Sequence, residues 1–177
     1  MMRMMVTIVC LLACVAIAQG TEEKDIWAPF RPLVGEWEGT GGEGTAQVEA
    51  QYYFVLGERF LEARHRTEFP PDEANPKGGV HEDRGFISYD HSREAYIFRQ
   101  FHVEGFVNTY VLDSLASDGK TMIFVSEAIE NAPSGTRAKL VVSMASEDEL
   151  ATDFHVAWPE QEFQCYSQNN YRRSLPK

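Results

Sequence analysis

Hydrophobic and polar residues alternate with a period of two along most of the chain. In residues 59–69 one face carries Leu61, Ala63, His65, Thr67 and Phe69, and charged residues occupy the positions between them. Residues 47–56 repeat the pattern, with apolar side chains at the even positions and Gln or Glu among the odd ones. Such alternation predicts strands with one buried and one solvated face.

The same pattern, broken by short turns, predicts ten strands and no helix of ten or more residues. The predicted strands are residues 35–41, 47–56, 59–69, 83–89, 94–103, 106–115, 121–130, 137–145, 150–158 and 162–173. A continuous meander of this length favours a closed barrel, since closure removes exposed sheet edges. We therefore expect an all-β fold: a single antiparallel meander barrel of about ten strands with a short N-terminal lead-in. The one long connection, residues 70–82, is either a binding loop or a surface insertion.

The N-terminus has the features of an export signal. Arg3 is followed by an apolar run over residues 4–17 that is too short to span a bilayer, and by the small-x-small site at residues 16–18. We expect cleavage before Gln19, and so a signal peptide at 1–18, a lead-in at 19–32 and a barrel domain at 33–175. The protein would then be secreted or periplasmic. The alternative is a lipoprotein anchored at Cys14, which ends an imperfect lipobox.

Charge, hydrophobicity and cysteine content argue against a nucleic-acid partner, membrane insertion and an internal disulfide. The net charge of −11 repels phosphate backbones, so we expect no nucleic-acid partner. Beyond the signal no run is apolar for 18 or more residues, and we expect no membrane insertion after signal cleavage. Cleavage leaves Cys165 as the single cysteine, which predicts no internal disulfide and a buried, unreactive thiol.

Two short motifs stand at the ends of the predicted meander: Gly-Glu-Trp-Glu-Gly at residues 35–39 and Tyr-Arg-Arg at residues 171–173. They resemble the calycin superfamily, which includes lipocalins, fatty-acid-binding proteins and nitrobindin-like haem barrels. Together with residues 85–90, they look closest to uncharacterised bacterial domains with a Gly-x-Trp-x-Gly opening. The resemblance implies a ligand-holding barrel. In lipocalins an arginine covers the tryptophan where the first and last strands meet, which implies structural closure by Trp37 and Arg173.

Alternation also identifies candidate ligand-binding residues. His65 shares an apolar face and is either a core histidine or a polar anchor for a ligand. His102 shares a face with Tyr96 and Phe98, and the opposite face carries Arg99, so either face could point inward. The expected ligand-binding set is Tyr52, Phe54, His65, Tyr96, Phe98 and His102.

The nitrobindin-like resemblance offers a second possibility, because residues 154–157 resemble the strand that carries the haem-ligating histidine in that family. His155 is therefore the alternative haem ligand, although alternation places it with Asp153 on the outer face and a further strand follows it. The resemblance also extends to the His-Glu-Asp-Arg-Gly-Phe run at residues 81–86.

The chain lacks the motifs of nucleophilic hydrolases, zinc proteases and phosphate-binding loops, so we expect neither catalysis nor a metal or other cofactor. We interpret the protein as an exported binding protein that encloses a small, mostly apolar ligand. A haem barrel with gas-reactive or isomerase-type activity is the alternative. A barrel filled by its own side chains, serving as a surface for another protein, is a third possibility.

Overall fold

A computed structural model describes residues 25–73 and 75–174 of the 177-residue chain. The predicted signal peptide, Cys14 and the first part of the lead-in lie outside the described residues.

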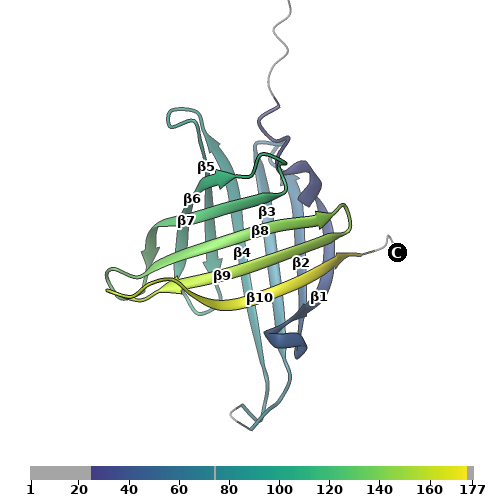
Figure 1. Ribbon diagram of the computed structural model, residues 1–177, viewed down its shortest axis with the longest axis vertical. Helices are drawn as coiled ribbons and strands as arrows, with labels where there is room; N and C mark the ends of the chain where they lie inside the picture. The colour runs from purple at the N-terminus through teal and green to yellow at the C-terminus, as the bar shows by residue number, and fades with distance from the viewer. Residues whose placement is uncertain (1–24, 74, 175–177) are drawn as a thin grey trace, which may run out of the picture.

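The chain forms one closed, antiparallel barrel of ten strands, as the alternation predicted (Figure 1). Each strand pairs with its neighbours in sequence, and β1 closes the wall against β10. The strands are β1 (Gly35–Gly41), β2 (Ala46–Val55), β3 (Phe60–Phe69), β4 (Gly79–Asp90), β5 (Ala95–His102), β6 (Val107–Leu115), β7 (Thr121–Glu130), β8 (Arg137–Ser146), β9 (Glu149–Ala157) and β10 (Gln164–Arg173). Two 3-10 turns, η1 (Arg31–Leu33) and η2 (Gly42–Gly44), flank β1.

The long connection is shorter than predicted, because β4 begins at Gly79 and not at Asp83. Its first residues pair with the end of β3, with Gly79 opposite Phe69 and His81 opposite Thr67. The β3–β4 hairpin therefore extends below the rest of the barrel (Figure 1). As a result His81 belongs to the barrel wall.

The predicted position of Cys165 in the core is wrong. Pairing between β9 and β10 shifts register between Cys165 and Ser167, so that His155 pairs with Cys165 while Phe154 pairs with Ser167. This irregularity reverses the alternation, because a bulge inserts one residue into one strand only. The thiol of Cys165 is exposed, and Phe163 and Cys165 do not share the inner face of Tyr171.

The lead-in closes one end of the barrel, which we call the lead-in end. The side chains of Trp27, Phe30 and Leu33 are buried there. Phe30 packs edge-on against Tyr96, with 4.8 Å between ring centroids, and Trp27 packs similarly against Phe54 at 5.3 Å. An aromatic plug therefore separates this end from solvent.

The interior next to this plug is filled by large side chains. Tyr110 is 0% exposed, and Trp37 and Phe124 are each 1% exposed. Gly85 makes room for another large side chain, since a Cβ there would lie 2.6 Å from the Phe98 ring.

Among the described residues, no helix is long and apolar enough to cross a membrane.

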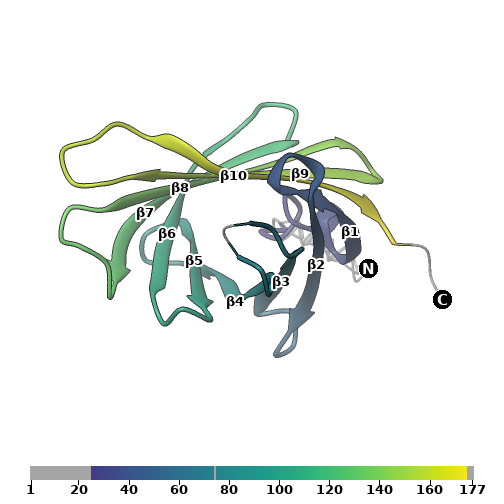
Figure 2. The same ribbon diagram turned by 90° about the horizontal axis from the view of Figure 1, so that it is seen from below.

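Viewed from below, the strands form a flattened ring (Figure 2). Strands β8–β10 lie along one side of this ring, and strands β2–β5 lie along the other. This view looks toward the end opposite the plug, where β5 ends at His102 and β6 begins at Val107. We call it the histidine end.

Candidate functional site

The residues expected to bind ligand divide between the two ends of the barrel. Phe54 and Tyr96 pack against the lead-in plug, and Tyr96 also donates a hydrogen bond to the Ile26 carbonyl. Phe98 and Tyr52 lie between the ends, 2% and 3% exposed. His65 and His102 belong to the histidine end. The predicted set is therefore not one contiguous pocket.

Burial along β5 settles which face of that strand points inward. Ile97, Phe98 and Gln100 are buried, whereas Arg99 and Phe101 are exposed, and the hydrogen bond from Gln100 to buried Asp83 marks the face of Phe98 and Gln100 as the inner one. Since side chains alternate across a strand, His102 lies on the inner face and Arg99 on the outer one.

Asp83 is the centre of a polar cluster on β3, β4 and β5. It lies directly across from His65 on β3 and from His102 on β5. His81 precedes it by two positions on β4 and therefore shares its face. Register alone thus brings one carboxylate and three imidazoles together on the inner wall.

Hydrogen bonds join His65 and Gln100 to this carboxylate, and His65 in turn to Tyr52. His65 Nδ1 lies 2.7 Å from Asp83 Oδ1, and its Nε2 lies 2.9 Å from the Tyr52 hydroxyl. Since a carboxylate only accepts, His65 donates through Nδ1, and its Nε2 accepts from Tyr52 when the ring is neutral. Gln100 Nε2 donates to the same Asp83 oxygen at 2.7 Å.

The second oxygen of Asp83 faces His81, at 3.5 Å from its Nε2. The other ring nitrogen, Nδ1, lies 2.7 Å from Glu104 Oε1. His102 stacks on the Phe106 ring at 4.1 Å, and its Nε2 lies 3.1 Å from the amide nitrogen of Asn108. Within the described part of the chain, buried His102 Nδ1 has no hydrogen-bond partner, and neither does Asn108 Oδ1.

The environment of each group sets its charge. The contact with Asp83 is the main cause that raises the pKa of His81 to about 9, whereas burial lowers the pKa of His102 to about 4. Burial opposes ionisation of Asp83, but its contacts with His65, His81 and Gln100 lower its pKa well below the usual range. At neutral pH the cluster therefore holds an anionic Asp83, a cationic His81 and a neutral His102.

The opposite wall of the histidine end is apolar. Ile129, Leu140 and Phe154 face inward from β7, β8 and β9, and all three are half-buried against the core. Val156, two residues beyond Phe154 on β9, is half-buried as well. In the flattened ring, β8 and β9 lie across from β3 and β4, which carry much of the polar cluster (Figure 2).

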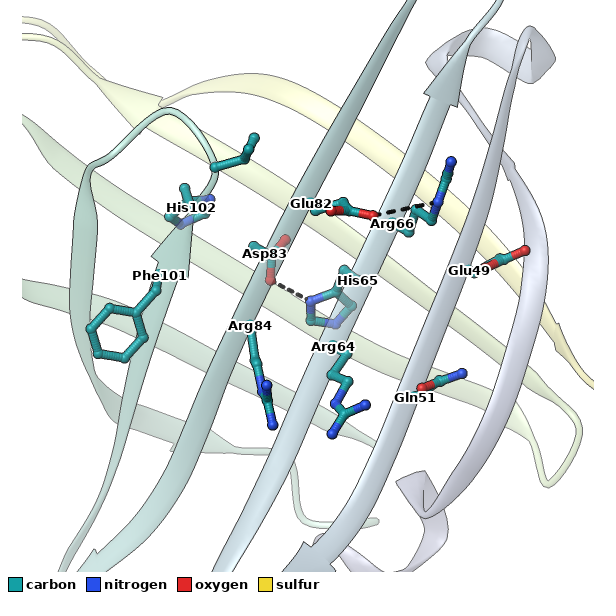
Figure 3. A pocket seen from close by; sticks show the side chains of 11 residues that line it. Glu49, Gln51, Arg64, His65, Arg66, Glu82, Asp83, Arg84, Phe101 and His102 are labelled. Carbon is teal, nitrogen blue, oxygen red and sulfur yellow. Dashed lines mark hydrogen bonds and ion pairs between the residues drawn. The ribbon is translucent and has the colours of Figure 1, made fainter.

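A separate hollow of about 510 Å³ lies over the outer surface of β2–β5. All but three of its 11 lining residues alternate outward, including Arg64, Arg66 and Glu82 (Figure 3). The three inward residues are His65, Asp83 and His102, and the figure shows His65 and Asp83 pointing toward one another from neighbouring strands. The outer hollow is therefore formed mainly by outward side chains, and it shares only these three residues with the inner cluster.

The alternative haem ligand lies outside the barrel wall. His155 pairs with Lys139, and the neighbouring pair of Phe154 with Leu140 points inward. Asp153 is also on the outer face, where it accepts a hydrogen bond from Gln168. An interior haem would need a ligand other than His155.

Sequence reasoning missed Asp83, Gln100 and Asn108, and assigned His81 to a loop. One signal was available. Carrying the period of two back from Ile87 through Gly85 reaches Asp83 and then His81, which places both on the inner face.

Comparison with known proteins supports the fold and no narrower assignment. No protein-family profile matches the chain, and neither does any curated protein sequence. Among solved structures, the barrel is similar to the crystal structure of Rv2717c from M. tuberculosis, with a TM-score of 0.59 and 18% sequence identity. The match covers 84% of this chain and 97% of that one. The comparison thus supports the fold, a closed antiparallel β-barrel.

Proposed function

We propose that this protein is an exported binding protein that holds a small molecule, with an apolar body and a polar end, at the histidine end of its barrel. The observation that carries the proposal is the division of this end into two walls. One wall presents His65, His81 and His102, and the other presents half-buried aliphatic and aromatic side chains. Small-molecule sites commonly combine an apolar lining with a few oriented polar groups.

The apolar wall supplies the affinity in this proposal. Ile129, Leu140 and Phe154 keep part of their surface accessible. A ligand that covers them gains roughly 25 cal/mol for each Å² of apolar area removed from water. The lead-in end has no comparable role, because Trp27 and Phe30 already cover Phe54 and Tyr96.

The polar wall supplies the orientation. His81 is cationic at neutral pH and its side chain is 29% exposed. Its Nδ1–H is bound to Glu104, but its Nε2 lies 3.5 Å from Asp83, too far for a close hydrogen bond, so the Nε2–H can turn to an acidic or hydrogen-bond-accepting group of the ligand. Asp83 and Glu104 fix the ring of His81 from two sides. A group held in this way needs little reorganisation on binding.

The test is a titration with an environment-sensitive fluorescent fatty-acid analogue, in the mature protein and in two variants of β7. Ile129→Trp places a larger side chain on the inner face at the histidine end, where the ligand would lie. Val125→Trp makes a comparable increase in volume on the outer face, where Val125 pairs with Val111. We expect the first variant to weaken binding at least tenfold and the second to bind like the wild type.

Equal affinity in the wild type and in Ile129→Trp would contradict the proposal, and so would a wild-type protein that does not bind the analogue. Mass spectrometry of material extracted from the purified protein identifies a natural ligand independently. An acidic amphiphile is the expected class.

A further inference from the structure

We propose that His81, Asp83 and His102 form a binding site for one divalent transition-metal ion, of which zinc is the reference case. One donor atom from each residue lies within 4.8 Å of the others. The inference deepens the proposed function and rests on it for its biological role: the metal would replace the proton on Nε2 of His81 and would then be the positive group that binds the polar end of the ligand. Metal binding itself needs no organic ligand.

The backbone brings the three donors together. His81 and Asp83 are two residues apart on β4, so their side chains leave the same face. His102 is the direct partner of Asp83 on β5, and directly opposed residues have their Cβ atoms about 5 Å apart. The rings of His81 and His102 are 5.5 Å apart between centroids. Two adjacent strands therefore supply a compact set of two imidazoles and one carboxylate.

Neighbouring groups already orient two of the donors. His65 and Gln100 both bind Oδ1 of Asp83, which leaves Oδ2 toward His81. Glu104 binds Nδ1 of His81, which leaves Nε2 toward Asp83. Metal-ligating histidines usually have a carboxylate or carbonyl on the second ring nitrogen, and ligating carboxylates are usually hydrogen-bonded in turn. Both features are present here.

His102 provides an independent observation. Its Nδ1 is buried and has no partner among the described residues, whereas its Nε2 meets the side-chain amide of Asn108. A buried nitrogen without a partner costs free energy. A metal ion on Nδ1 would remove this cost, with Nε2–H donating to Asn108 once the amide of Asn108 presents its oxygen.

The donor set selects the class of metal. Two imidazoles and one carboxylate suit zinc, cobalt(II) or iron(II) and leave coordination positions open for water or a ligand. Donors bound to zinc at about 2.1 Å lie about 3 to 3.5 Å from one another, so binding requires one ring to move by about 1 Å. His81 is the donor placed to make this movement, because its side chain is 29% exposed near the start of β4 and the Glu104 carboxylate that binds its Nδ1 is itself 49% exposed and can move with it.

Calorimetric titration of the chelator-treated mature protein with Zn²⁺ tests the proposal. We expect one equivalent to bind, and Co²⁺ to give visible absorption bands of a nitrogen- and oxygen-ligated ion. His81→Gln and His102→Gln should each weaken Zn²⁺ binding at least tenfold. His91→Gln, in an exposed turn, and His155→Gln, on the outer wall, are matched controls and should bind like the wild type.

A wild-type protein without a zinc site, or equal losses in the His155→Gln control, would overturn the proposal. NMR chemical shifts of the histidine ring nitrogens provide a second test. They are measured on the wild-type protein, so a variant that misfolds does not affect the result. Zn²⁺ should move the signals of His81 and His102 and leave that of His155 in place, and the reverse pattern would exclude the site. Binding of the fatty-acid analogue by metal-free protein separates a failure of this inference from a failure of the proposed function.

Discussion

The guanidinium of Arg173 lies over the Trp37 ring, with its central carbon 4.1 Å from the ring centroid. The two residues are direct partners in the pairing of β1 with β10. Arg173 also donates to the carbonyls of Val34 and Pro32, both at 2.8 Å, and to that of Glu147. One side chain therefore joins the first strand, the last strand, the lead-in and the β8–β9 turn.

Replacement of Trp37 by alanine should lower the free energy of unfolding by about 3 to 5 kcal/mol, as for other large aromatic side chains removed from a core. The ring is 1% exposed, and its Nε1–H donates to the Leu33 carbonyl at 2.8 Å. Denaturant unfolding gives the value. A loss below about 1 kcal/mol would show that Trp37 is not an essential part of the packing.

Arg173→Lys should also destabilise the barrel, by about 1 to 2 kcal/mol, even though the charge is kept. A lysine cannot reach several carbonyls with one planar fork and stacks less well on an indole ring. Arg172→Lys is the matched control, because the Arg172 side chain is 82% exposed. Equal midpoints for the two variants in urea would argue against the bridging role of Arg173.

His65→Ala should cost about 1 to 3 kcal/mol of stability, because it removes one partner from the buried carboxylate of Asp83 and another from the Tyr52 hydroxyl. His65 is thus a structural member of the cluster, whatever it contributes to binding. His155→Ala on the outer wall should change stability by less than about 0.5 kcal/mol. Thermal unfolding of both variants makes the comparison. Similar losses of stability would mean that the contacts of His65 with Asp83 and Tyr52 do not stabilise the fold.

Ionisation of Glu62 should make the free energy of unfolding depend on pH. Its side chain is 6% exposed on the outer face and contacts both Arg64 and Arg84. Burial opposes ionisation, but the two arginines together lower its pKa below 4.5. Because the folded-state pKa is the lower one, the stabilisation is present above the ordinary pKa and is lost as pH falls through the folded value.

Glu62→Gln should therefore lower the free energy of unfolding by about 1 to 3 kcal/mol at pH 7. The difference from the wild type should shrink as the pH falls below about 4.5. Urea denaturation across this range measures it, with Glu49→Gln on the exposed outer face as control. A difference that is constant with pH would mean that ionisation of Glu62 does not stabilise the fold.

The mature protein should begin within a residue or two of Gln19 and carry no lipid. The intact mass of the exported protein is the measurement. A mass that corresponds to a diacylglycerol-modified Cys14 would instead mean that the protein is anchored to a membrane.

The strands were predictable from sequence because nearly every inner position of the barrel wall requires an apolar side chain. A residue such as Ala63 or Tyr52 must be apolar to be buried, and the charged residues between them must reach solvent. Two deviations were not predictable in this way. The irregularity at Cys165 depends on how β10 pairs with β9, and the length of β4 depends on pairing of Val80 with Glu68.

The polar cluster was harder to predict, because its members violate the rule that identifies the core. Asp83 and Gln100 are buried polar residues that are stable only with their partners in place. The period of two places Asp83 and His81 on the inner face, but the cluster draws on three strands, so no local pattern shows which residues meet there. Only the register of β3, β4 and β5 shows that His65, Asp83 and His102 lie side by side.

Closure of the wall by β1 and β10 has a consequence for how the chain folds. Arg173 and Pro32 are 141 positions apart and are linked by a hydrogen bond. One edge of β1 remains unpaired until the last strand, β10, has been synthesised and has docked against it. Contacts of such long sequence separation slow folding and leave an incomplete chain prone to pair with other chains. The ring can therefore close only once the complete sequence is present.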